Sequence, residues 1–371
     1  MRLALAYFLS VIILSNCWAD KPAPLGLVLA GGGAKGAYEV GVWQTLVESG
    51  LSKRVAAISG TSVGAINAAL FAAGVEPKTC AALWEGEVGG IFKFNTNLVA
   101  KICGEDGVVK IEHAYAAMRN NIQADCEYEA KRRGCAVTDL PQETIAQIEE
   151  NCESVARKRL FFQLPIMKTM VDMLNDFDES SPFDGFLSST YLYSLIFREL
   201  PRKWPRKAPV TYATSLRKNN EGNAFSAVRF RIDKESPERR AMVICASACI
   251  PFIFGACEID NGLYVDGGFE LRGGDNVPLS PILENHPEIK TAIVVYLEHN
   301  KDPITKNRIK RNKQNADKAG IALIEITPSK RIGGAFGWGG VFDASPETAK
   351  RLIELGRKDA EAKLRECGLT K

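Results

Sequence analysis

A serine that stands between two glycines is the side chain of this 371-residue sequence best placed to do chemistry. Ser62 lies in Gly60-Thr61-Ser62-Val63-Gly64, directly after the apolar residues 55–58 and before a run of small residues. A strand that turns sharply into a helix at such a serine exposes the hydroxyl above a sheet as a nucleophile. The segment therefore predicts acyl transfer, in which the serine attacks a carbonyl carbon.

A glycine-rich segment earlier in the chain supplies the complementary group. Gly31-Gly32-Gly33-Ala34-Lys35-Gly36, hereafter the glycine loop, follows the apolar residues 25–30 and precedes a helical pattern. A loop of this kind directs backbone N–H groups at an anion. Donors held in place stabilise the oxygen that becomes negative during acyl transfer, so we expect the glycine loop to form an oxyanion hole.

A serine hydroxyl is a poor nucleophile at neutral pH, so Ser62 needs a base. Asp266 ends the short apolar segment 263–265 and is followed by Gly267 and Gly268. This pattern predicts a carboxylate at the carboxyl edge of a sheet, where open α/β sheets hold their active sites. Asp266 is therefore one candidate base.

Histidine is the other candidate base. His286 lies in a polar connection and His299 follows the strand-like segment 292–297, so either could complete the Ser-Asp-His order of an α/β-hydrolase esterase. His113 precedes an aromatic-containing helix and is expected to be structural. The residues alone leave the aspartate and the histidine mechanisms both open.

The glycine loop also matches the dinucleotide-binding fingerprint, which makes an oxidoreductase an alternative. That fingerprint needs an acidic residue at the end of the second strand, but residues 49–75 contain no Asp or Glu. The phosphate-binding loop of nucleotide hydrolases needs lysine and a hydroxyl residue after the last glycine, where this chain has Ala37-Tyr38. We therefore expect no organic cofactor.

Ten cysteines and three histidines bear on disulfides and metals. Three of the cysteines, Cys245, Cys249 and Cys257, lie among apolar residues and are expected to be small core residues. The spacings contain no paired Cys-x-x-Cys knuckles, so we expect no metal site. Five others crowd one stretch and favour disulfides in an oxidising compartment: Cys80, Cys103, Cys126, Cys135 and Cys152.

The elements that must position Ser62 and Asp266 alternate between strands and helices. This order is typical of an α/β fold with a mostly parallel sheet covered by helices. An amphipathic helix over residues 346–367 closes the chain. Strand-like patterns occur at residues 25–30, 55–58, 210–215, 224–230, 263–266, 292–297 and 321–326.

Two segments differ from this alternating pattern. Residues 1–19 combine Arg2, an apolar run and small residues at their end, which predicts a signal peptide and an exported protein, periplasmic or secreted. A lipoprotein anchor at Cys17 or a retained anchor is less favoured. Residues 79–205 are helical, charged and cysteine-bearing, and we interpret them as an insertion or cap within a domain over residues 20–371.

Charge gives a limited indication of partners. Lys and Arg number 47 against 44 Asp and Glu, so the net charge of +3 favours no nucleic-acid partner. Basic clusters at residues 202–207 and 306–313 could attract anionic lipid headgroups, which predicts peripheral contact with a membrane surface. Solvated loops are the alternative interpretation of both clusters.

Taken together, four motifs make the chain resemble the patatin-like phospholipases, lipid acyl hydrolases that use a Ser-Asp dyad and no histidine. The motifs are the glycine loop, the serine turn, Ala246-Ser247-Ala248-Cys249-Ile250-Pro251, and Asp266-Gly267-Gly268 with Asn276 and Pro278 downstream. The resemblance covers residues 25–278, apart from the insertion.

The resemblance implies a three-layer α/β/α fold and a Ser62-Asp266 dyad that acts on phospholipids or related acyl esters without metal or cofactor. It also implies oxyanion donors within Gly31, Gly32, Gly33 and Ala34. Supporting roles follow for Lys35, Gly36, Gly60, Gly64, Gly267 and Gly268. A histidine-dependent esterase and a catalytically inactive lipid-binding module remain alternatives.

Overall fold

The structure is a computed structural model. It describes residues 22–86, 126–148 without 128, 132 and 147, 189–219, 224–250, 254–332 and 346–370. The predicted signal peptide and much of the predicted insertion lie outside these residues. The chain divides into two units, one of Met1–Lys93, Ser189–Ile250 and Ala256–Lys371, and one of Phe94–Ser188 with Pro251–Gly255.

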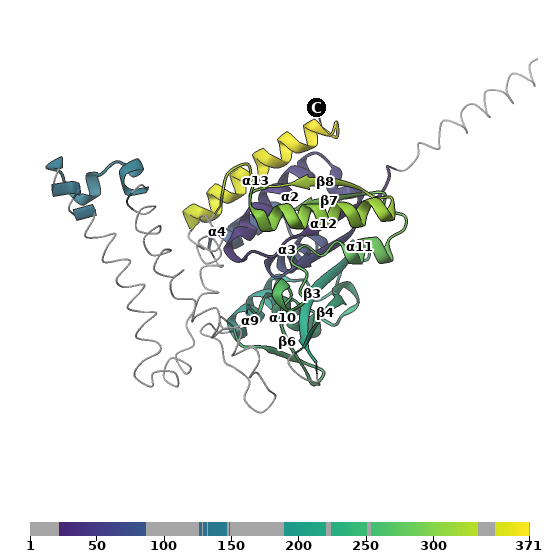
Figure 1. The fold of residues 1–371 in the computed structure, drawn as a ribbon. Coiled ribbons are helices and arrows are strands. Elements are labelled where there is room, and N and C mark those ends of the chain that lie inside the picture. Colours follow the sequence, from purple (N-terminus) through teal and green to yellow (C-terminus); the bar gives the residue numbers. More distant parts are fainter. Residues whose placement is uncertain are drawn as a thin grey trace, which may run out of the picture. The chain divides into compact units, whose positions relative to one another are not determined.

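An eight-stranded sheet forms the centre of the first unit (Figure 1). Its order is β5-β6-β3-β2-β1-β7-β8, and β4 pairs with β3. The pairs among β3, β2, β1, β7 and β8 are parallel, and the pairs that involve β4, β5 or β6 are antiparallel. The strands are β1 (Leu25–Leu29), β2 (Val55–Thr61), β3 (Val210–Lys218), β4 (Phe225–Arg231), β5 (Cys257–Ile259), β6 (Gly262–Asp266), β7 (Thr291–Val295) and β8 (Ala322–Ile326).

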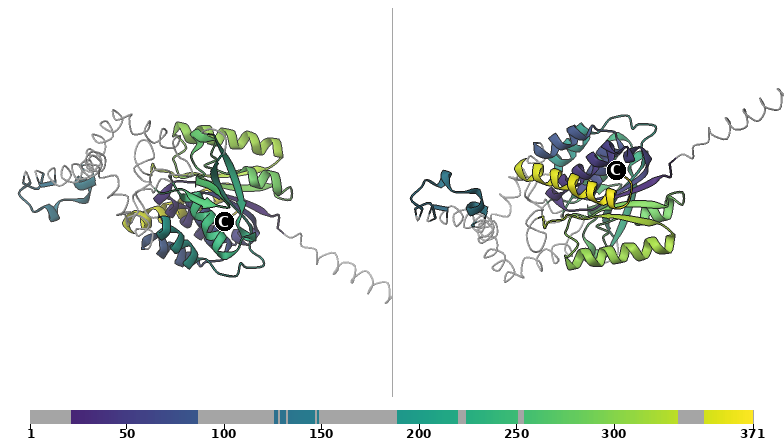
Figure 2. Two further views of the ribbon diagram at one scale, coloured as in Figure 1. Left: turned by 90° about the horizontal axis from the view of Figure 1, so that it is seen from below. Right: turned by 90° about the horizontal axis from the view of Figure 1, so that it is seen from above.

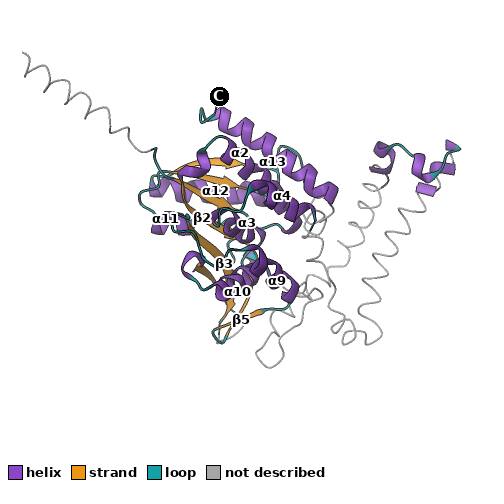
Figure 3. Cartoon of the chain, turned by 180° about the vertical axis from the view of Figure 1, so that it is seen from behind, coloured by secondary structure: helices purple, strands orange, loops and turns teal. Residues whose placement is uncertain are grey.

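Helices cover both faces of this sheet (Figures 2 and 3). The α helices are α2 (Ala37–Glu48), α3 (Val63–Ala72), α4 (Pro77–Glu85), α9 (Ser189–Glu199), α10 (Pro237–Ala248), α11 (Ser280–Asn285), α12 (Pro303–Ala319) and α13 (Pro346–Glu366). Helices α11 and α12 lie on one face, and α2, α3, α10 and α13 lie on the other. The predicted three-layer α/β/α fold with a mostly parallel sheet is confirmed.

Short 3-10 turns connect several of these elements. They are η1 (Gly33–Gly36), η2 (Leu51–Arg54), η4 (Val137–Asp139), η5 (Ile232–Lys234) and η6 (Glu270–Arg272). The crossover from β1 to β2 and the crossover from β7 to β8 step in opposite directions from the middle of the sheet. Open α/β sheets bind ligands where the strand order reverses in this way, which here is between β1 and β7.

The basic run 306–313 lies on a helix, so its interpretation as a loop was wrong. Asp302 caps α12 because its carboxylate accepts the N–H groups of Ile304 and Thr305. The helix ends at Gly320, which adopts a left-handed conformation. Its buried residues are Thr305, Asn312 and Ala316, so its inner face is largely polar.

The second unit is described only in part. Cys126, Ala130 and Leu140 form a small buried cluster within it. In the described part of the chain, Cys80, Cys126 and Cys135 form no disulfide with one another. Cys103 and Cys152 lie outside the described residues, and the disulfide prediction stays open.

None of the helices in the described part of the chain is long and apolar enough to cross a membrane.

Candidate active site

Ser62 occupies a strained turn between β2 and α3. Its backbone has φ 55° and ψ −127°, in the left-handed range that side chains with a Cβ rarely adopt. The Ser62 N–H donates to Ser247 Oγ at 2.9 Å, and that hydroxyl donates to the Thr214 carbonyl at 2.6 Å. Strain held by surrounding contacts is a feature of functional sites, and this conformation fits a nucleophile at a strand-to-helix turn.

The turn is held tightly against β1 by small residues. A Cβ on Gly64 would overlap the Leu29 carbonyl group, so only glycine permits α3 to begin this close to β1. Thr61 fixes the other side of the turn because its hydroxyl donates to the Asp275 carbonyl at 2.7 Å. The predicted roles of the small residues around Ser62 therefore have a steric basis.

Asp266 reaches the same edge of the sheet on a strand that runs the other way. Thr61 on β2 pairs with Thr214 on β3, and the next residue of β3, Ser215, pairs with Asp266 on β6. Ser62 and Asp266 therefore lie at the same level on either side of β3. The sequence predicted this carboxylate at the carboxyl edge, and β6 delivers it there as an antiparallel strand.

The Asp266 carboxylate is buried and only partly satisfied. Its Oδ1 accepts the Gly268 N–H at 2.7 Å, while Oδ2 has no aligned hydrogen-bond partner among the described residues. Burial raises the pKa of Asp266 to about 6, and the neighbouring Ser62 hydroxyl and the Gly268 N–H act in the opposite direction. The Ser62 hydroxyl thus lies near the carboxylate without an aligned hydrogen bond, as catalytic pairs often do in free enzymes.

The glycine loop lies directly over Ser62. A Cβ on Gly31 would stand 3.1 Å from the Cβ of Ser62 and 2.5 Å from Asn276 Oδ1. Two hydrogen bonds hold Gly31 to Asn276: the Gly31 N–H donates to the Asn276 carbonyl at 3.0 Å, and Asn276 Nδ2 donates to the Gly31 carbonyl at 3.2 Å. Gly33 has φ 59° and begins η1, so the N–H groups of Gly33 and Ala34 have no preceding turn to bond.

Lys35 anchors the far end of the glycine loop. Its side chain is buried, and Nζ pairs with Glu298 at 3.1 Å. Glu298 also pairs with Arg308 of α12, and Arg308 pairs with Glu270. Glu270 lies in η6, four residues after Asp266, and it also pairs with Arg311. This charged network joins the glycine loop to the segment that follows the candidate base.

A buried polar cluster lies beneath the glycine loop. Asn67 Nδ2 donates to the Gly36 carbonyl at 3.0 Å and to Glu39 Oε2 at 2.8 Å. Trp84 Nε1 donates to Asn67 Oδ1 at 3.0 Å, so this amide joins three elements. Burial raises the pKa of Glu39 well above its ordinary value, while Asn67 and the Ala30 backbone act against that increase.

The two predicted histidines that the structure describes have other hydrogen-bond partners. His286 is buried, with Nε2 3.1 Å from the Tyr212 hydroxyl and Nδ1 2.9 Å from Glu288. His299 Nδ1 accepts the Lys301 N–H at 3.0 Å. The third histidine of the chain lies outside the described residues. Within those residues, no imidazole forms a hydrogen bond with the candidate serine or aspartate.

Five polar residues that support this site had no role predicted from the sequence. Ser247 and Asn276 stand inside recognised motifs, but their contacts form only in the folded chain. A glutamate on the otherwise apolar face of α2 and an amide among the small residues of α3 were weak signals of the buried polar cluster. The five are Glu39, Asn67, Ser247, Asn276 and Glu298.

Comparison with known proteins adds an independent line of evidence. Residues 27–283 match the family described as patatin-like phospholipase. Lysophospholipase nte1 of Aspergillus terreus is 43% identical over 77 residues, which make up 20% of this chain and 5% of that protein. This chain thus spans only a small part of that relative.

Two solved structures resemble the chain at low identity. VipD from Legionella pneumophila is 17% identical with a TM-score of 0.41, and the match covers 93% of this chain and 67% of that one. The ExoU–SpcU complex from Pseudomonas aeruginosa matches with 14% identity and a TM-score of 0.37 over 93% of this chain and 52% of that one.

Proposed function

The chain belongs to the patatin-like phospholipase family, and on that premise we propose that it is a lipid acyl hydrolase with Ser62 as nucleophile and Asp266 as base. One observation carries the proposal. The strained serine and the buried carboxylate lie at one level on either side of β3, beneath a loop of backbone N–H groups. No part of this arrangement needs an imidazole.

In the proposed reaction, Asp266 accepts the proton of Ser62 as the serine oxygen attacks the ester carbonyl. The oxygen that becomes negative accepts hydrogen bonds from the N–H groups of Gly32, Gly33 and Ala34. The carbon–oxygen bond to the alcohol then breaks, and the alcohol leaves with the proton held by Asp266. Asp266 next takes a proton from water as the water oxygen attacks the acyl-enzyme. The bond between the acyl carbon and Ser62 Oγ then breaks, the fatty acid leaves, and Asp266 returns the proton to Ser62.

An apolar cavity supports a fatty acyl chain as the acyl group of the substrate. Helix α3 carries Ser62 at its start and contributes Ile66 and Leu70, one and two turns further along, to the cavity wall. An apolar wall along the helix that begins at the nucleophile suits a hydrocarbon tail better than a polar acyl group. Helices α4 and α9 supply most of the other lining residues: Leu83, Trp84, Leu192, Leu195, Ile196, Glu199 and Leu200.

Helix α12 supports work at an anionic lipid surface. Lys306, Lys310 and Lys313 are exposed on it, whereas Arg308 and Arg311 pair with Glu270. Exposed lysines on one helix attract anionic headgroups. We therefore propose a phospholipid in a membrane as the substrate class and a peripheral mode of contact.

Fatty-acid release from phospholipid and lysophospholipid vesicles tests the proposal. Ser62→Ala and Asp266→Asn are expected to lower the rate by about 10⁴-fold or more, as loss of a nucleophile or its base does in serine hydrolases. His299→Gln is the matched control and should stay within about threefold of the wild type, because a change that small corresponds to less than 1 kcal/mol in the barrier.

Three outcomes would contradict the proposal. Full activity in Ser62→Ala would exclude Ser62 as the nucleophile. Loss of activity in His299→Gln with a normal melting temperature would favour the histidine-dependent esterase. Tight vesicle binding by the wild type without any fatty-acid release would instead favour a lipid-binding module.

A further inference from the structure

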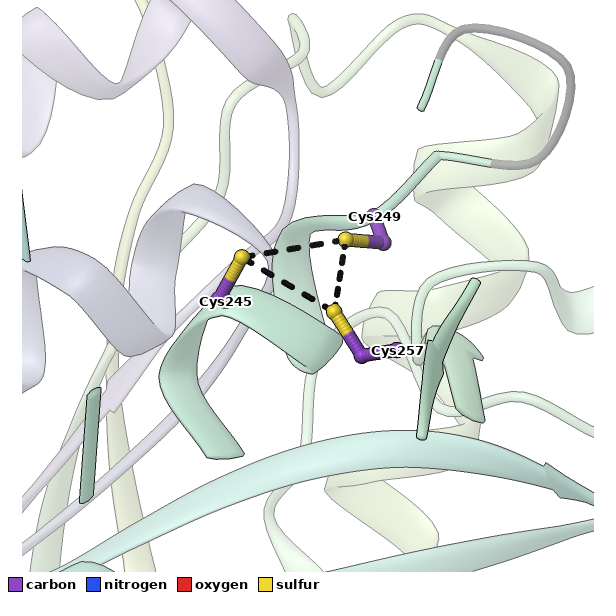
Figure 4. Close-up of side chains that lie close together, drawn as sticks. All are labelled: Cys245, Cys249 and Cys257. Atoms are coloured by element: carbon purple, nitrogen blue, oxygen red, sulfur yellow. Dashed lines mark hydrogen bonds between the residues drawn. The ribbon is translucent and has the colours of Figure 1, made fainter. Parts of the chain in front are cut away.

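Three cysteines that were expected to be small core residues converge on one point (Figure 4). Cys245 and Cys249 are buried, and Cys257 is partly buried. Their sulfur atoms are 3.9 Å apart for Cys245–Cys249, 3.2 Å for Cys249–Cys257 and 3.8 Å for Cys245–Cys257. All three thiols are free, and their side chains point toward one another.

Two elements bring these sulfur atoms together. Cys245 lies on α10 and Cys249 directly follows that helix, four residues further on, which places both on one face. Cys257 begins β5, the short strand that the sequence did not predict. Ordinary zinc knuckles use pairs of nearby cysteines, so the wider spacing of this trio concealed its convergence.

We propose that Cys245, Cys249 and Cys257 bind a thiophilic d10 cation of the Zn²⁺ class. Thiolates around zinc at about 2.3 Å in a tetrahedron lie about 3.8 Å from one another, close to two of the three observed separations. Three thiolates buried together are stable only beside a cation, whereas soft metals prefer such ligands. Each thiol releases its proton to solvent as its sulfur binds, and water completes the fourth position.

The position of this trithiolate site links it to the base of the proposed reaction. The Cys249 carbonyl accepts the Asp266 N–H at 2.8 Å. Cys257 pairs across the β5–β6 ladder with Tyr264, two residues before Asp266. A bound cation would therefore join the end of α10 to the hairpin that carries Asp266. The inference goes beyond the proposed hydrolase, because metal binding is measured independently of ester cleavage.

A zinc titration of the full-length, reduced and metal-free chain tests the inference. With Zn²⁺ in competition with a chromophoric chelator, we expect one equivalent bound per chain. Cys245→Ala, Cys249→Ala and Cys257→Ala should each weaken binding about 100-fold or more, since even outer-sphere partners of metal ligands are worth 10- to 100-fold. Cys367→Ala is the matched control because Cys367 is exposed and remote in sequence, and it should keep wild-type affinity.

Two further measurements include the wild type, so the test does not rest on variant folding alone. Co²⁺ added to the wild type should produce a thiolate-to-metal charge-transfer band, which only sulfur ligation gives. Zn²⁺ at about 100 times its dissociation constant should raise Tm by about 5 °C, and the Cys257→Ala variant should lose that shift.

Several results would overturn the inference. These are no Zn²⁺ uptake by the reduced wild type, uptake that the three variants retain, or a Co²⁺ complex without the charge-transfer band. A disulfide between Cys249 and Cys257 in unreduced protein, found by peptide mapping, together with no metal uptake after reduction, would identify a redox pair instead.

Discussion

At the scale of single residues, the environment of Asp266 determines how the proposed reaction depends on pH. Burial raises the pKa of this carboxyl to about 6, and the base must be ionised to accept the serine proton. We expect kcat/KM for a soluble ester to rise with pH through an apparent pKa of about 6 and then to level off. Initial rates measured over a series of pH values test this. An apparent pKa near 4 would contradict the assignment of Asp266 as the base.

The same carboxyl should lower stability as pH increases. Its pKa is higher in the folded chain than the ordinary value of 3.8, so the folded state holds the proton more tightly than the unfolded state. The stabilisation that the protonated Asp266 carboxyl gives the folded state is therefore fully present below pH 4. It is lost as pH rises from about 4 through about 6.

The Asp266→Asn variant should not lose stability as pH rises from 4 to 6, because the amide has no charge to bury. We expect the variant to be up to about 3 kcal/mol more stable than the wild type at pH 7.5 and nearly equal to it at pH 4. Urea denaturation at both pH values measures the difference. Equal stabilities at pH 7.5 would show that burial of the charge is not costly.

Ser62 is expected to reduce stability through its backbone conformation. Its φ of 55° is tolerated by glycine without the clash between Cβ and the carbonyl oxygen that other residues suffer. Ser62→Gly should therefore gain about 1 kcal/mol in free energy of unfolding while it loses activity. Ser62→Ala is the matched control, because it removes the same hydroxyl but keeps the Cβ. A gain in both variants would point to the hydroxyl rather than to backbone strain.

At the scale of elements, patterns in the sequence predicted those parts of the fold that bury apolar side chains. Seven predicted strands match β1 to β4 and β6 to β8. Most of them are largely buried and therefore appear as runs of apolar residues, whereas β4 has no buried residue. Helix α12 was missed because Thr305 and Asn312 occupy its buried face and leave no apolar stripe. The strand β5 was also missed, because its three residues are too few to show the alternation of a strand.

The candidate site follows the same division. The serine turn and the glycine loop are local signals, since a strand, a turn and a helix lie within a few residues of one another. The antiparallel arrival of Asp266 and the contacts of Asn276 depend on pairing between distant segments. No local pattern encodes that pairing, and it was the resemblance to a family that favoured Asp266 over the histidines.

The close contact between α3 and β1 leads to a steric prediction. A Cβ on Gly64 would overlap the Leu29 carbonyl group, so Gly64→Ala must push α3 and Ser62 away from the glycine loop. We expect a loss of about 2–4 kcal/mol in free energy of unfolding and a fall in kcat, since overpacking at rigid backbone is costly.

Gly74→Ala, at the other end of α3, is the matched control. Gly74 has φ 75° but nothing within contact of an added Cβ, so the variant should lose only about 1 kcal/mol and keep its kcat. Thermal melts and initial rates on a soluble ester compare the two variants. Equal losses in both would mean that the contact with β1 is not tight.

At the scale of the whole sheet unit, charge is distributed between a partly buried network and an exposed helix surface. Within the network, Glu298 neutralises the buried Lys35 of the glycine loop. Glu298→Gln should lower the free energy of unfolding by about 1–3 kcal/mol, because a buried cation then loses its charged partner. Glu354→Gln, which removes an exposed pair with Lys358, should leave the free energy of unfolding nearly unchanged. Urea denaturation distinguishes the two, and equal small losses would show that Lys35 is satisfied by other contacts.

The exposed helix surface carries the proposed attraction to anionic lipid. Lys306, Lys310 and Lys313 should each contribute about 1 kcal/mol to the free energy of vesicle binding. Replacing all three by Gln should therefore weaken binding to phosphatidylserine-containing vesicles about 100-fold at low salt. Higher salt should reduce the wild-type affinity toward that of the variant, since these charges are exposed. Vesicle sedimentation measures both effects.

Helix α13 offers the control, because it covers the opposite face of the sheet from α12. Replacing Lys350, Lys358 and Lys363 by Gln changes the net charge equally and should leave vesicle affinity within about threefold of the wild type, as expected if only nearby charges act. Both triple variants should cleave a soluble ester at the wild-type rate. Equal loss of vesicle binding in both would mean that net charge governs the contact, and α12 would then have no special part in approaching the membrane.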